Sequence, residues 1–437
     1  MLDNRRMKQR YSTARYGKAL TVACTVVATL AAVWLALNLS LGNKQVDTRL
    51  TRLYSVADAQ FPRAMSAILT PALVPGNRVE ALLNGDQTFP AMLSSIRSAQ
   101  QSITFETYIF WSGSIGKEFA AALMERAKSG VKVHILLDWV GGQLEDALIA
   151  RMQQSGIEIR RYNTPHWYNL HRLNNRTHRK LLVVDGRIGY TGGIGIADPW
   201  RGHAQDPQHW RDTHFRVEGP VVGQMQSAFV DNWMQVTGDV LHGEPYFPAP
   251  GPAGEHFAQV FTSSPGGGAE SMQLMYLMSI TAAAQSIRLS ASYFVPDNVA
   301  VDTLVAALKR GVKVQIVLPG PHMDMGIVRR ASRASWGKLL AAGAEIYEYQ
   351  PTMYHVKVMM VDALWVSAGS TNFDNRSFSI NDEANLNAYD AAFARRQIEV
   401  FEDDLRQSRR ITLEEWESRP RLDKVLDWAA SLLSSQL

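Results

Sequence analysis

Apolar positions along this chain recur with two spacings, one typical of helices and one of strands. Val301, Leu304 and Leu308 are spaced for one face of a helix, and Gly311 is placed to end that helix. The apolar runs VKVHILL and VKVQIVL follow helical stretches and have the length and β-branched content of buried strands. Helices that alternate with buried strands predict an α/β fold in which a mostly parallel sheet is flanked by helices.

The same succession of patterns occurs twice along the chain. Three segments of the first half return in the same order in the second half, with offsets between 181 and 187 residues. They are AQQSI (99–103) with AAQSI (283–287), SGVKVHILLDW (129–139) with RGVKVQIVLPG (310–320), and SGIEIRRY (155–162) with AGAEIYEY (342–349). We therefore expect two pseudosymmetric modules, 80–247 and 255–420, joined by a segment rich in proline and glycine.

The N-terminal region predicts a membrane anchor. The uncharged apolar stretch 19–42 is long enough to cross a bilayer as a helix. The bases of segment 1–18 precede it, so this tail is expected in the cytoplasm, and 43–79 is expected to be a membrane-proximal linker. A cleaved signal peptide and a helix lying in the membrane interface are the alternatives.

Composition and charge narrow the class of protein. A hydrophobic content of 46% and a charged content of 20% are typical of a globular protein. The net charge is +4, but residues 1–18 hold six bases and one acid, a balance of +5, so the remainder sums to −1. A working domain without basic excess disfavours a nucleic-acid partner. The single cysteine, Cys24, excludes an intramolecular disulfide.

One pattern that carries chemistry, His-x-Lys-x4-Asp, occurs once in each half. Since side chains alternate along a strand, each histidine and its lysine point the same way. Two modules packed face to face would bring both pairs around one point. The six residues are His178, Lys180 and Asp185, and His355, Lys357 and Asp362.

Such a centre suits transfer of a phosphodiester. Two lysines offset charge on the phosphoryl oxygens, one imidazole attacks phosphorus, and the other exchanges protons with the leaving and entering alcohols. This chemistry needs no metal and no cofactor. Asp185 and Asp362 belong to the motif, but their spacing predicts structural hydrogen bonds at the strand ends.

The segments after each motif supply further candidates. Small-residue turns lie seven residues beyond each motif aspartate, and there Gly193, Ser370 and Asn372 are expected to contact phosphate. Carboxylates are expected to orient the imidazoles, Asp212 in the first half and Glu383 in the second.

These residues resemble the phospholipase D superfamily with two HKD motifs, and most closely its bacterial cardiolipin synthases. The resemblance covers about residues 80–420 and is carried by ITFETYIFW, NRTHRKLLVVDGR, WRDTHFRVEGP and NFDNRSFSINDEAN. It implies that His178 is the nucleophile and His355 the acid–base, and that the protein is a single-pass protein of the bacterial inner membrane. It also implies phosphatidylglycerol as substrate. Both halves of the site lie in one chain, so a monomer suffices. The family often has asparagine where this chain has Gly195.

Four functions follow from these residues. The first is a cardiolipin synthase that transfers a phosphatidyl group between two phosphatidylglycerol molecules and releases glycerol. The second is a phospholipase D that uses water and releases phosphatidic acid. A membrane-tethered nuclease and a non-catalytic membrane-binding protein are the others, disfavoured by the charge balance and by the intact motifs respectively.

Other groups of residues carry weaker signals. His203, His209 and His214 cluster with Asp206, but their spacing matches no zinc pattern, and a surface loop is expected. Tryptophans are expected in the core or at a lipid-facing mouth: Trp111, Trp139, Trp167, Trp200 and Trp210. Arginines of one predicted helix bind a second headgroup or face solvent: Arg329, Arg330 and Arg333. The amphipathic helix 421–437 is expected to pack on the protein through its apolar stripe, with the membrane as the alternative: Leu422, Val425, Leu426, Ala429 and Leu432.

Overall fold

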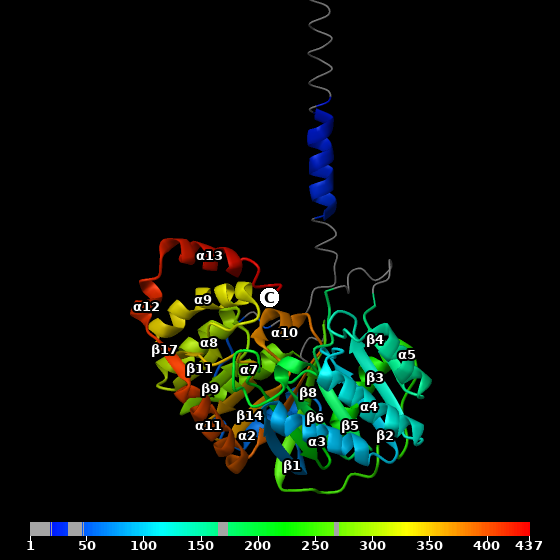
Figure 1. Cartoon of the computed structure of the whole chain (residues 1–437). Coiled ribbons are helices and arrows are strands. Elements are labelled where there is room, and N and C mark those ends of the chain that lie inside the picture. The colour runs from blue at the N-terminus through cyan, green and yellow to red at the C-terminus, as the bar shows by residue number, and fades with distance from the viewer. Residues whose placement is uncertain (1–17, 19, 34–45, 47, 165–173, 266–270) are drawn as a thin grey trace, which may run out of the picture. The chain divides into compact units, whose positions relative to one another are not determined.

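The computed structural model describes residues 18, 20–33, 46, 48–164, 174–265 and 271–437. The chain divides into two units, residues 1–44 and 45–437, and each is described by itself. In the first unit, residues 20–33 form a helix with exposed side chains (Figure 1). Among the described residues no helix has both the length and the apolar content needed to cross a membrane, and part of the predicted anchor at 19–42 lies outside the described residues.

The second unit holds two successive sets of elements after helix α2 (Gln60–Ile68). The first set comprises β1 (Val74–Leu83), α3 (Asn84–Ser98), β2 (Ser102–Thr107), α4 (Ser114–Lys128), β3 (Lys132–Asp138), α5 (Asp146–Gln154), β4 (Glu158–Tyr162), β5 (Lys180–Val184), β6 (Ile188–Gly192), the 3-10 turn η2 (Asp198–Trp200), β7 (Thr213–Glu218) and α6 (Val222–Thr237).

The second set repeats this order and adds three elements at its end. It comprises β8 (His256–Ser263), α7 (Met272–Ala282), β9 (Ser286–Ala291), β10 (Phe294–Val295), α8 (Asn298–Lys309), β11 (Lys313–Pro319), α9 (Gly326–Ala341), β12 (Glu345–Tyr349), β13 (Lys357–Val361), β14 (Trp365–Gly369), β15 (Phe373–Asp374), α10 (Asn375–Ser379), β16 (Glu383–Tyr389), α11 (Ala391–Arg406), β17 (Ser408–Ile411), α12 (Leu413–Glu417) and α13 (Arg421–Ser431).

The strands of both sets join in one sheet, which in the described part of the chain has 15 strands in the order β17-β12-β11-β9-β13-β14-β16-β8-β1-β7-β6-β5-β2-β3-β4. Strands β8 and β1 pair at the middle. Outward from them, corresponding strands of the two sets follow in the same order. The internal repeat of the sequence therefore appears as pseudosymmetry of the sheet.

The prediction of a mostly parallel sheet is wrong. Strands β2, β3 and β4 are parallel, as are β9, β11 and β12, whereas the other pairs of the large sheet are antiparallel among the described residues. The physical reason is a tight hairpin after each motif strand. Asp185 and Gly186, with φ of 52° and 62°, turn β5 into β6, and Asp362 and Ala363, at 51° and 50°, turn β13 into β14. The loops 185–187 and 362–364 each have three residues, and their first two left-handed residues form a tight turn in which the N–H of Arg187 donates to Val184 and that of Leu364 to Val361.

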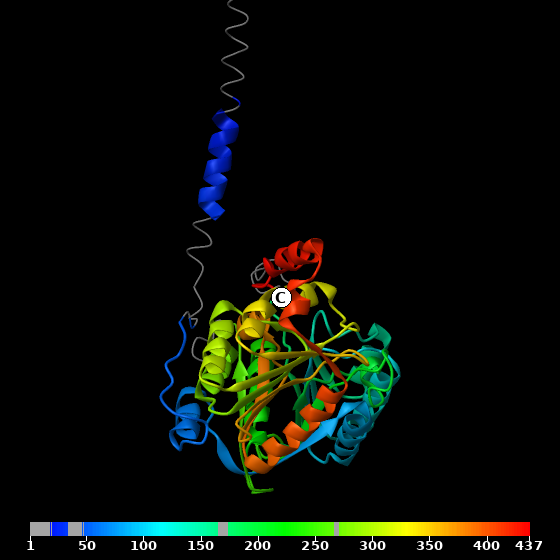
Figure 2. The same ribbon diagram turned by 90° about the vertical axis from the view of Figure 1, so that its left-hand side faces the viewer.

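Each half buries its sheet on both faces. Leu182 and Val184 of β5 contact the apolar cluster beneath α3 and α4, whereas Leu181 and Val183 enter a cluster that also contains β13 and β16 residues. This second cluster joins the two halves. In Figure 2 helices α4 and α5 of the first half and α7 and α8 of the second lie on opposite outer sides, whereas α6 and α11 pack on the shared cluster. The expected face-to-face packing is confirmed by this shared core.

Candidate active site

The two motifs meet at one cavity of about 410 Å³. His178 and Lys180 line it from the first half, and His355 and Asn372 line it from the second. Each histidine lies two residues before the first residue of its strand, β5 or β13, at the edge of the sheet where the antiparallel neighbours β2 and β9 end. The sequence prediction that both halves contribute to one centre agrees with this arrangement.

Each lysine lies against its own histidine. Lys180 Nζ donates to the carbonyl oxygen of His178 at 3.0 Å, and Lys357 Nζ donates to that of His355 at 2.9 Å. Lys357 Nζ is also 3.2 Å from Nε2 of the His355 ring. The expected common direction of each pair is therefore observed, and two ammonium groups accompany two imidazoles.

The carboxylates orient the imidazoles across the two halves, and the predicted pairing within each half is wrong. His178 Nδ1 lies 2.9 Å from Oε1 of Glu383, which belongs to the second half. His355 Nδ1 lies 2.7 Å from Oδ2 of Asp212, which belongs to the first half. Each ring nitrogen Nδ1 is thus held by a carboxylate, and Nε2 is left for the cavity.

Backbone bridges between the halves cause this exchange. The N–H of His178 donates to the carbonyl of Asp382 at 2.9 Å, next to Glu383 in the chain. The N–H of His355 donates to the carbonyl of Arg211 at 2.7 Å, next to Asp212. The segment before each motif strand therefore runs beside the segment that carries the other half's carboxylate.

Further hydrogen bonds hold each carboxylate. The indole N–H of Trp200 donates to Asp212 Oδ2 at 2.8 Å, and the hydroxyl of Ser370 donates to Glu383. Gly193 lies so close that a Cβ there would stand 2.2 Å from Asp212 Oδ1, and its own N–H donates to Thr213.

Of the three residues predicted to contact phosphate, only Asn372 lines the cavity. Ser370 and Gly193 do not line the cavity; both serve the carboxylates that orient the histidines. Asn372 lines the cavity, and its Oδ1 accepts from Ser292 at 2.6 Å, which directs the amide N–H groups away from that serine. At the equivalent turn of the first half, a Cβ on Gly195 would lie 2.7 Å from Ile109, so an asparagine would collide there.

Burial lowers the pKa values of the two histidines and two lysines of the motifs. Burial lowers the pKa of His178 to about 4 and that of His355 to about 3. Burial, with the charge of Lys357, lowers the pKa of Lys180 to about 7, and burial lowers that of Lys357 to about 8. An anion placed among these four groups would raise all four pKa values, because it stabilises their charged forms. The site is thus electrostatically suited to an anion.

The two carboxylates, unlike the histidines and lysines, have pKa shifts that favour their charged forms. Burial alone would raise the pKa of Glu383, but the neighbouring His178 and Lys180 lower it overall. Burial likewise opposes ionisation of Asp212, and His355 and its hydrogen bond lower that pKa overall. Both carboxylates are therefore ionised and accept from Nδ1, which fixes the tautomer of each imidazole.

The motif aspartates lie outside the cavity. Asp185 accepts the backbone N–H groups of Gln100, Gln101 and Ser102, the last two at 2.7 and 2.9 Å. Asp362 accepts the equivalent N–H groups of residues 284, 285 and 286 at 2.8 to 2.9 Å. Each carboxylate ties a hairpin turn to the loop before β2 or β9. The structural role that their spacing predicts is confirmed by these hydrogen bonds, and among the described residues neither aspartate lines the cavity.

Aromatic side chains form much of the cavity wall. The ring centroids of Trp200 and Trp210 lie 5.2 and 5.5 Å from that of His355, and Trp111 also lines the cavity. Trp139 is instead covered by the guanidinium of Arg176 at 5.3 Å, and Trp167 lies outside the described residues. Three of the five tryptophans thus line the cavity, and Trp200 among them is also part of the apolar core of the first half, while a lipid-facing role stays a prediction.

Several lining residues were not predicted. Tyr108 follows β2 directly and lies with its ring centroid 5.3 Å from that of His178. Asp374 is buried, which raises its pKa to about 7. The available signal for Tyr108 is its position directly after β2, which neighbours a motif strand, whereas Asp374 ends the short strand β15. Nothing in the sequence placed Gln436 and Leu437 in the wall, where they also lie.

The histidines considered for zinc have separate partners. His203 Nδ1 lies 3.1 Å from Asp86 and His209 Nδ1 lies 2.7 Å from Asp206. His214 is buried, and burial lowers its pKa to about 3. Within the described ranges, no group of three or more histidine, cysteine or acidic side chains has the arrangement of a metal site.

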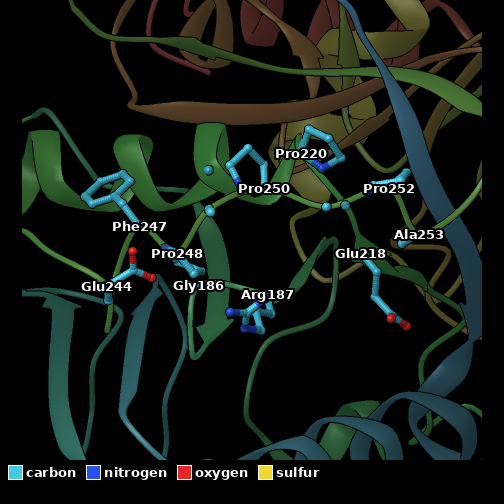
Figure 3. A pocket seen from close by; sticks show the side chains of 14 residues that line it. Gly186, Arg187, Glu218, Pro220, Glu244, Phe247, Pro248, Pro250, Pro252 and Ala253 are labelled. Atoms are coloured by element: carbon cyan, nitrogen blue, oxygen red, sulfur yellow. The ribbon is translucent and has the colours of Figure 1, made fainter.

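A second pocket of about 680 Å³ lies beneath the segment between the halves (Figure 3). In Figure 3 prolines of that segment face Arg187 and Glu218 across it. Its described lining residues include neither motif histidine nor motif lysine. It therefore contributes nothing to the centre formed by the two motifs.

Comparison with known proteins identifies the class and then the family. A family model described as "Cardiolipin synthase, PLD-like domain" matches residues 92–199 and 276–405, one segment in each half. The halves are thus PLD-like domains. Cardiolipin synthase A of Pseudomonas syringae is 33% identical over 85% of this chain and 78% of its own length. The major cardiolipin synthase ClsA of Bacillus subtilis is 34% identical over 82% and 75%. The chain belongs to the cardiolipin synthase family of PLD-like proteins.

A solved structure shares the fold. Phosphatidylserine synthase of Haemophilus influenzae superposes with a TM-score of 0.66 over 87% of this chain and all of that one. The sequences are 13% identical, so this likeness concerns the fold alone. It agrees with the duplicated mixed α/β arrangement described above.

Proposed function

We propose that this chain is a cardiolipin synthase that transfers a phosphatidyl group from one phosphatidylglycerol to another. Its relatives named above are cardiolipin synthases, and the residues of the cavity suit this chemistry. The observation that carries the proposal is the pair of imidazoles, each held through Nδ1 by a carboxylate of the other half, at one anion-suited cavity.

The first step is cleavage of the donor. Nε2 of His178 attacks the phosphorus, and the bond from phosphorus to the oxygen of the headgroup glycerol breaks. His355 gives a proton to that oxygen, so glycerol leaves and a phosphatidyl group remains on His178. Lys180 and Lys357 offset the charge that gathers on the phosphoryl oxygens, and the Asn372 amide donates to one of them.

The second step is transfer to the acceptor. His355, now neutral, takes the proton from the headgroup hydroxyl of a second phosphatidylglycerol. The resulting oxygen attacks phosphorus, the phosphorus–nitrogen bond to His178 breaks, and cardiolipin forms. No metal and no cofactor take part. Water in place of the second lipid would give phosphatidic acid, so the wall that excludes water decides between synthase and hydrolase.

The substrate also implies a place for the protein. We include in the proposal a single-pass anchor at 19–42, with residues 1–18 in the cytoplasm, in the inner membrane of a bacterium. Residues 43–79 would connect the anchor to modules at 80–247 and 255–420. Because both imidazoles and both carboxylates come from one chain, a monomer is sufficient.

The test uses the full chain in vesicles of phosphatidylglycerol, with lipid products measured by mass spectrometry. We expect cardiolipin and glycerol in equal amounts, with little phosphatidic acid. His178→Ala and His355→Ala should each lose at least about a thousandfold in rate. Phosphatidic acid as the main product, or full activity of the double variant, would contradict the proposal.

A further inference from the structure

Helix α13 lies on the protein with its polar side inward. Among its residues in Arg421–Ser431, the buried ones are Asp427 and Ala430. Asp427 is 1% exposed and forms ion pairs with Arg333 at 3.1 Å, Arg330 at 3.4 Å and Arg419 at 2.5 Å. The prediction that this helix packs on the protein is confirmed, but the face predicted to pack is wrong.

Two of the three arginines of α9 take part in this packing. Arg330 and Arg333 bind Asp427, whereas Arg329 pairs with Glu348 of β12 at 2.5 Å. The sequence predicts a headgroup site or a solvated face for these guanidinium groups, and the structure pairs them with carboxylates of the protein. Arg330 and Arg333 make the polar inner side of α13 electrostatically favourable.

The apolar side of the same helix faces outward. Leu422 is 70% exposed, Trp428 61% and Leu432 63%, and they share one stripe of the helix. We call this stripe the α13 face, which consists of Leu422, Val425, Leu426, Trp428, Ala429, Leu432 and Leu433. A helix whose apolar side is exposed and whose polar side is buried requires an apolar partner outside the molecule.

The inner side of α13, opposite the α13 face, lies beside the active site. Ala430 of α13 belongs to a small apolar cluster with Val328, which lines the catalytic cavity. The residues after α13 return to the cavity, where Leu437 accepts from the N–H of Arg376 at 3.1 Å and lines the wall. One short segment therefore carries both the exposed apolar stripe and part of the cavity wall.

We propose that the α13 face is the surface by which the folded unit binds an anionic phospholipid bilayer, so that headgroups enter the cavity beside residue 437. This proposal rests on the proposed lipid substrate. The partner is a bilayer because the helix that carries the stripe lies beside a phospholipid site. Charge agrees, since Arg421 and Lys424 are exposed on the same helix whereas Asp427 is turned inward.

A labelled cysteine tests the surface without relying on activity. In the full chain with Cys24→Ala, Ala429→Cys would carry a fluorophore in phosphatidylglycerol vesicles that contain nitroxide lipid. The matched control is Ala392→Cys, exposed on helix α11 at the opposite end of the folded unit (Figures 1 and 2). We expect lipid quenching at position 429 and quenching only from the aqueous side at 392.

Enzyme kinetics provide a second test of the bilayer contact. Leu422→Asn combined with Trp428→Asn should raise the apparent KM for phosphatidylglycerol in vesicles by at least about tenfold. Turnover of a short-chain, monomeric phosphatidylglycerol should stay within about twofold, because that substrate needs no bilayer contact. Val240→Asn with Phe257→Asn, which replaces apolar residues exposed elsewhere, should change neither value.

The outcomes separate the two proposals. Absence of lipid quenching at position 429, or unchanged vesicle kinetics in the α13 variant, would overturn the bilayer contact. A mass of two chains by light scattering, abolished by the same variant, would assign the face to a second copy and also overturn it. Lipid quenching without cardiolipin from either substrate would uphold the surface and refute the proposed function.

Discussion

At the scale of single residues, the centre is defined by contacts between two imidazole rings and two carboxylates. Each imidazole donates from Nδ1 to a buried carboxylate, Glu383 for His178 and Asp212 for His355. Nε2 then remains for the cavity. The proposed function needs this nitrogen unprotonated in His178, the nucleophile, and protonated in His355, whose pKa a bound phosphate raises. The two residues share the carboxylate contact, and their proposed roles depend on which one the donor phosphorus approaches.

The exchange of carboxylates between halves makes a prediction that trapping experiments check. A phosphatidyl ester of p-nitrophenol needs no proton from His355 for its first step. Asp212→Asn should therefore release one equivalent of p-nitrophenolate rapidly. Its later turnover should be about 10²- to 10⁴-fold slower than that of the unchanged protein, as for His355→Ala. Glu383→Gln should slow the burst itself, as His178→Ala should. Reversal of these two behaviours would mean that each carboxylate serves its own half.

The depressed lysine pKa values predict the pH dependence. A neutral Lys180 or Lys357 no longer offsets phosphoryl charge, and their pKa values are about 7 and 8. Because kcat/KM reports the free enzyme, it should fall between pH 7 and 8 on the basic side. On the acidic side, protonation of His178, whose pKa is about 4, should lower kcat/KM. A profile measured with monomeric substrate checks this.

The control for the pH profile keeps the charge. Lys180→Arg retains a cation at every working pH. The fall of kcat/KM on the basic side should therefore occur at higher pH in this variant, even though its rate is lower. An unchanged basic limb in this variant would show that Lys180 does not control it.

At the scale of elements, the two hairpin turns join the motif strands to the rest of each half. Asp185 fastens the β5–β6 turn to three successive N–H groups before β2, and Asp362 does the same before β9. Strand β2 is the direct neighbour of β5. These bonds therefore fix the position of β5 along β2, and with it the positions of His178 and Lys180.

Loss of one such fastening should affect stability more than chemistry. Asp185→Ala removes a charged acceptor of three N–H groups and should lower the free energy of unfolding by about 2–3 kcal/mol. The rate per folded molecule should change little, because Asp185 does not line the cavity. Urea denaturation with a matched Asp185→Asn variant, which keeps one oxygen acceptor, should give a smaller loss. A large loss of rate without loss of stability would show that Asp185 takes part in catalysis.

Local patterns predicted the elements and their repetition, because they depend on neighbours in the chain. The helix ending at Gly311, the strand after it and the common direction of His178 and Lys180 are of this kind. The antiparallel pairs were missed although VDG at 184–186 is a recognisable hairpin signal. Pairing of His178 with Glu383, 205 positions apart, depends on how the halves meet, and no local pattern records that.

At the scale of the whole molecule, the halves are joined by charge as well as by the shared apolar core. Arg211, beside Asp212, forms two hydrogen bonds of 2.8 and 2.9 Å with Asp404 of α11. Both side chains are buried. Burial opposes the charge of Arg211, but Asp404 more than compensates and raises its pKa. This ion pair fixes the segment on which the His355 carboxylate stands.

Removal of one partner should therefore disturb both stability and catalysis. Asp404→Ala leaves a buried guanidinium without its counter-charge and should destabilise the fold by about 3–5 kcal/mol. Denaturation midpoints and cardiolipin formation measure the two effects. The matched control is Glu399→Ala on the same helix, whose partner Arg396 is exposed, and it should change neither. Equal effects of the two substitutions would show that the inner pair does not join the halves.

The exchanged carboxylates have a consequence for the origin of the chain. A lone half would carry a histidine without its acid and an acid without its histidine, so it would hold no finished centre. Two identical halves related by a twofold axis would complete both pairs at once. An ancestor with one copy is thus able to work only as a homodimer, and fusion of its duplicated gene frees the two rings to specialise.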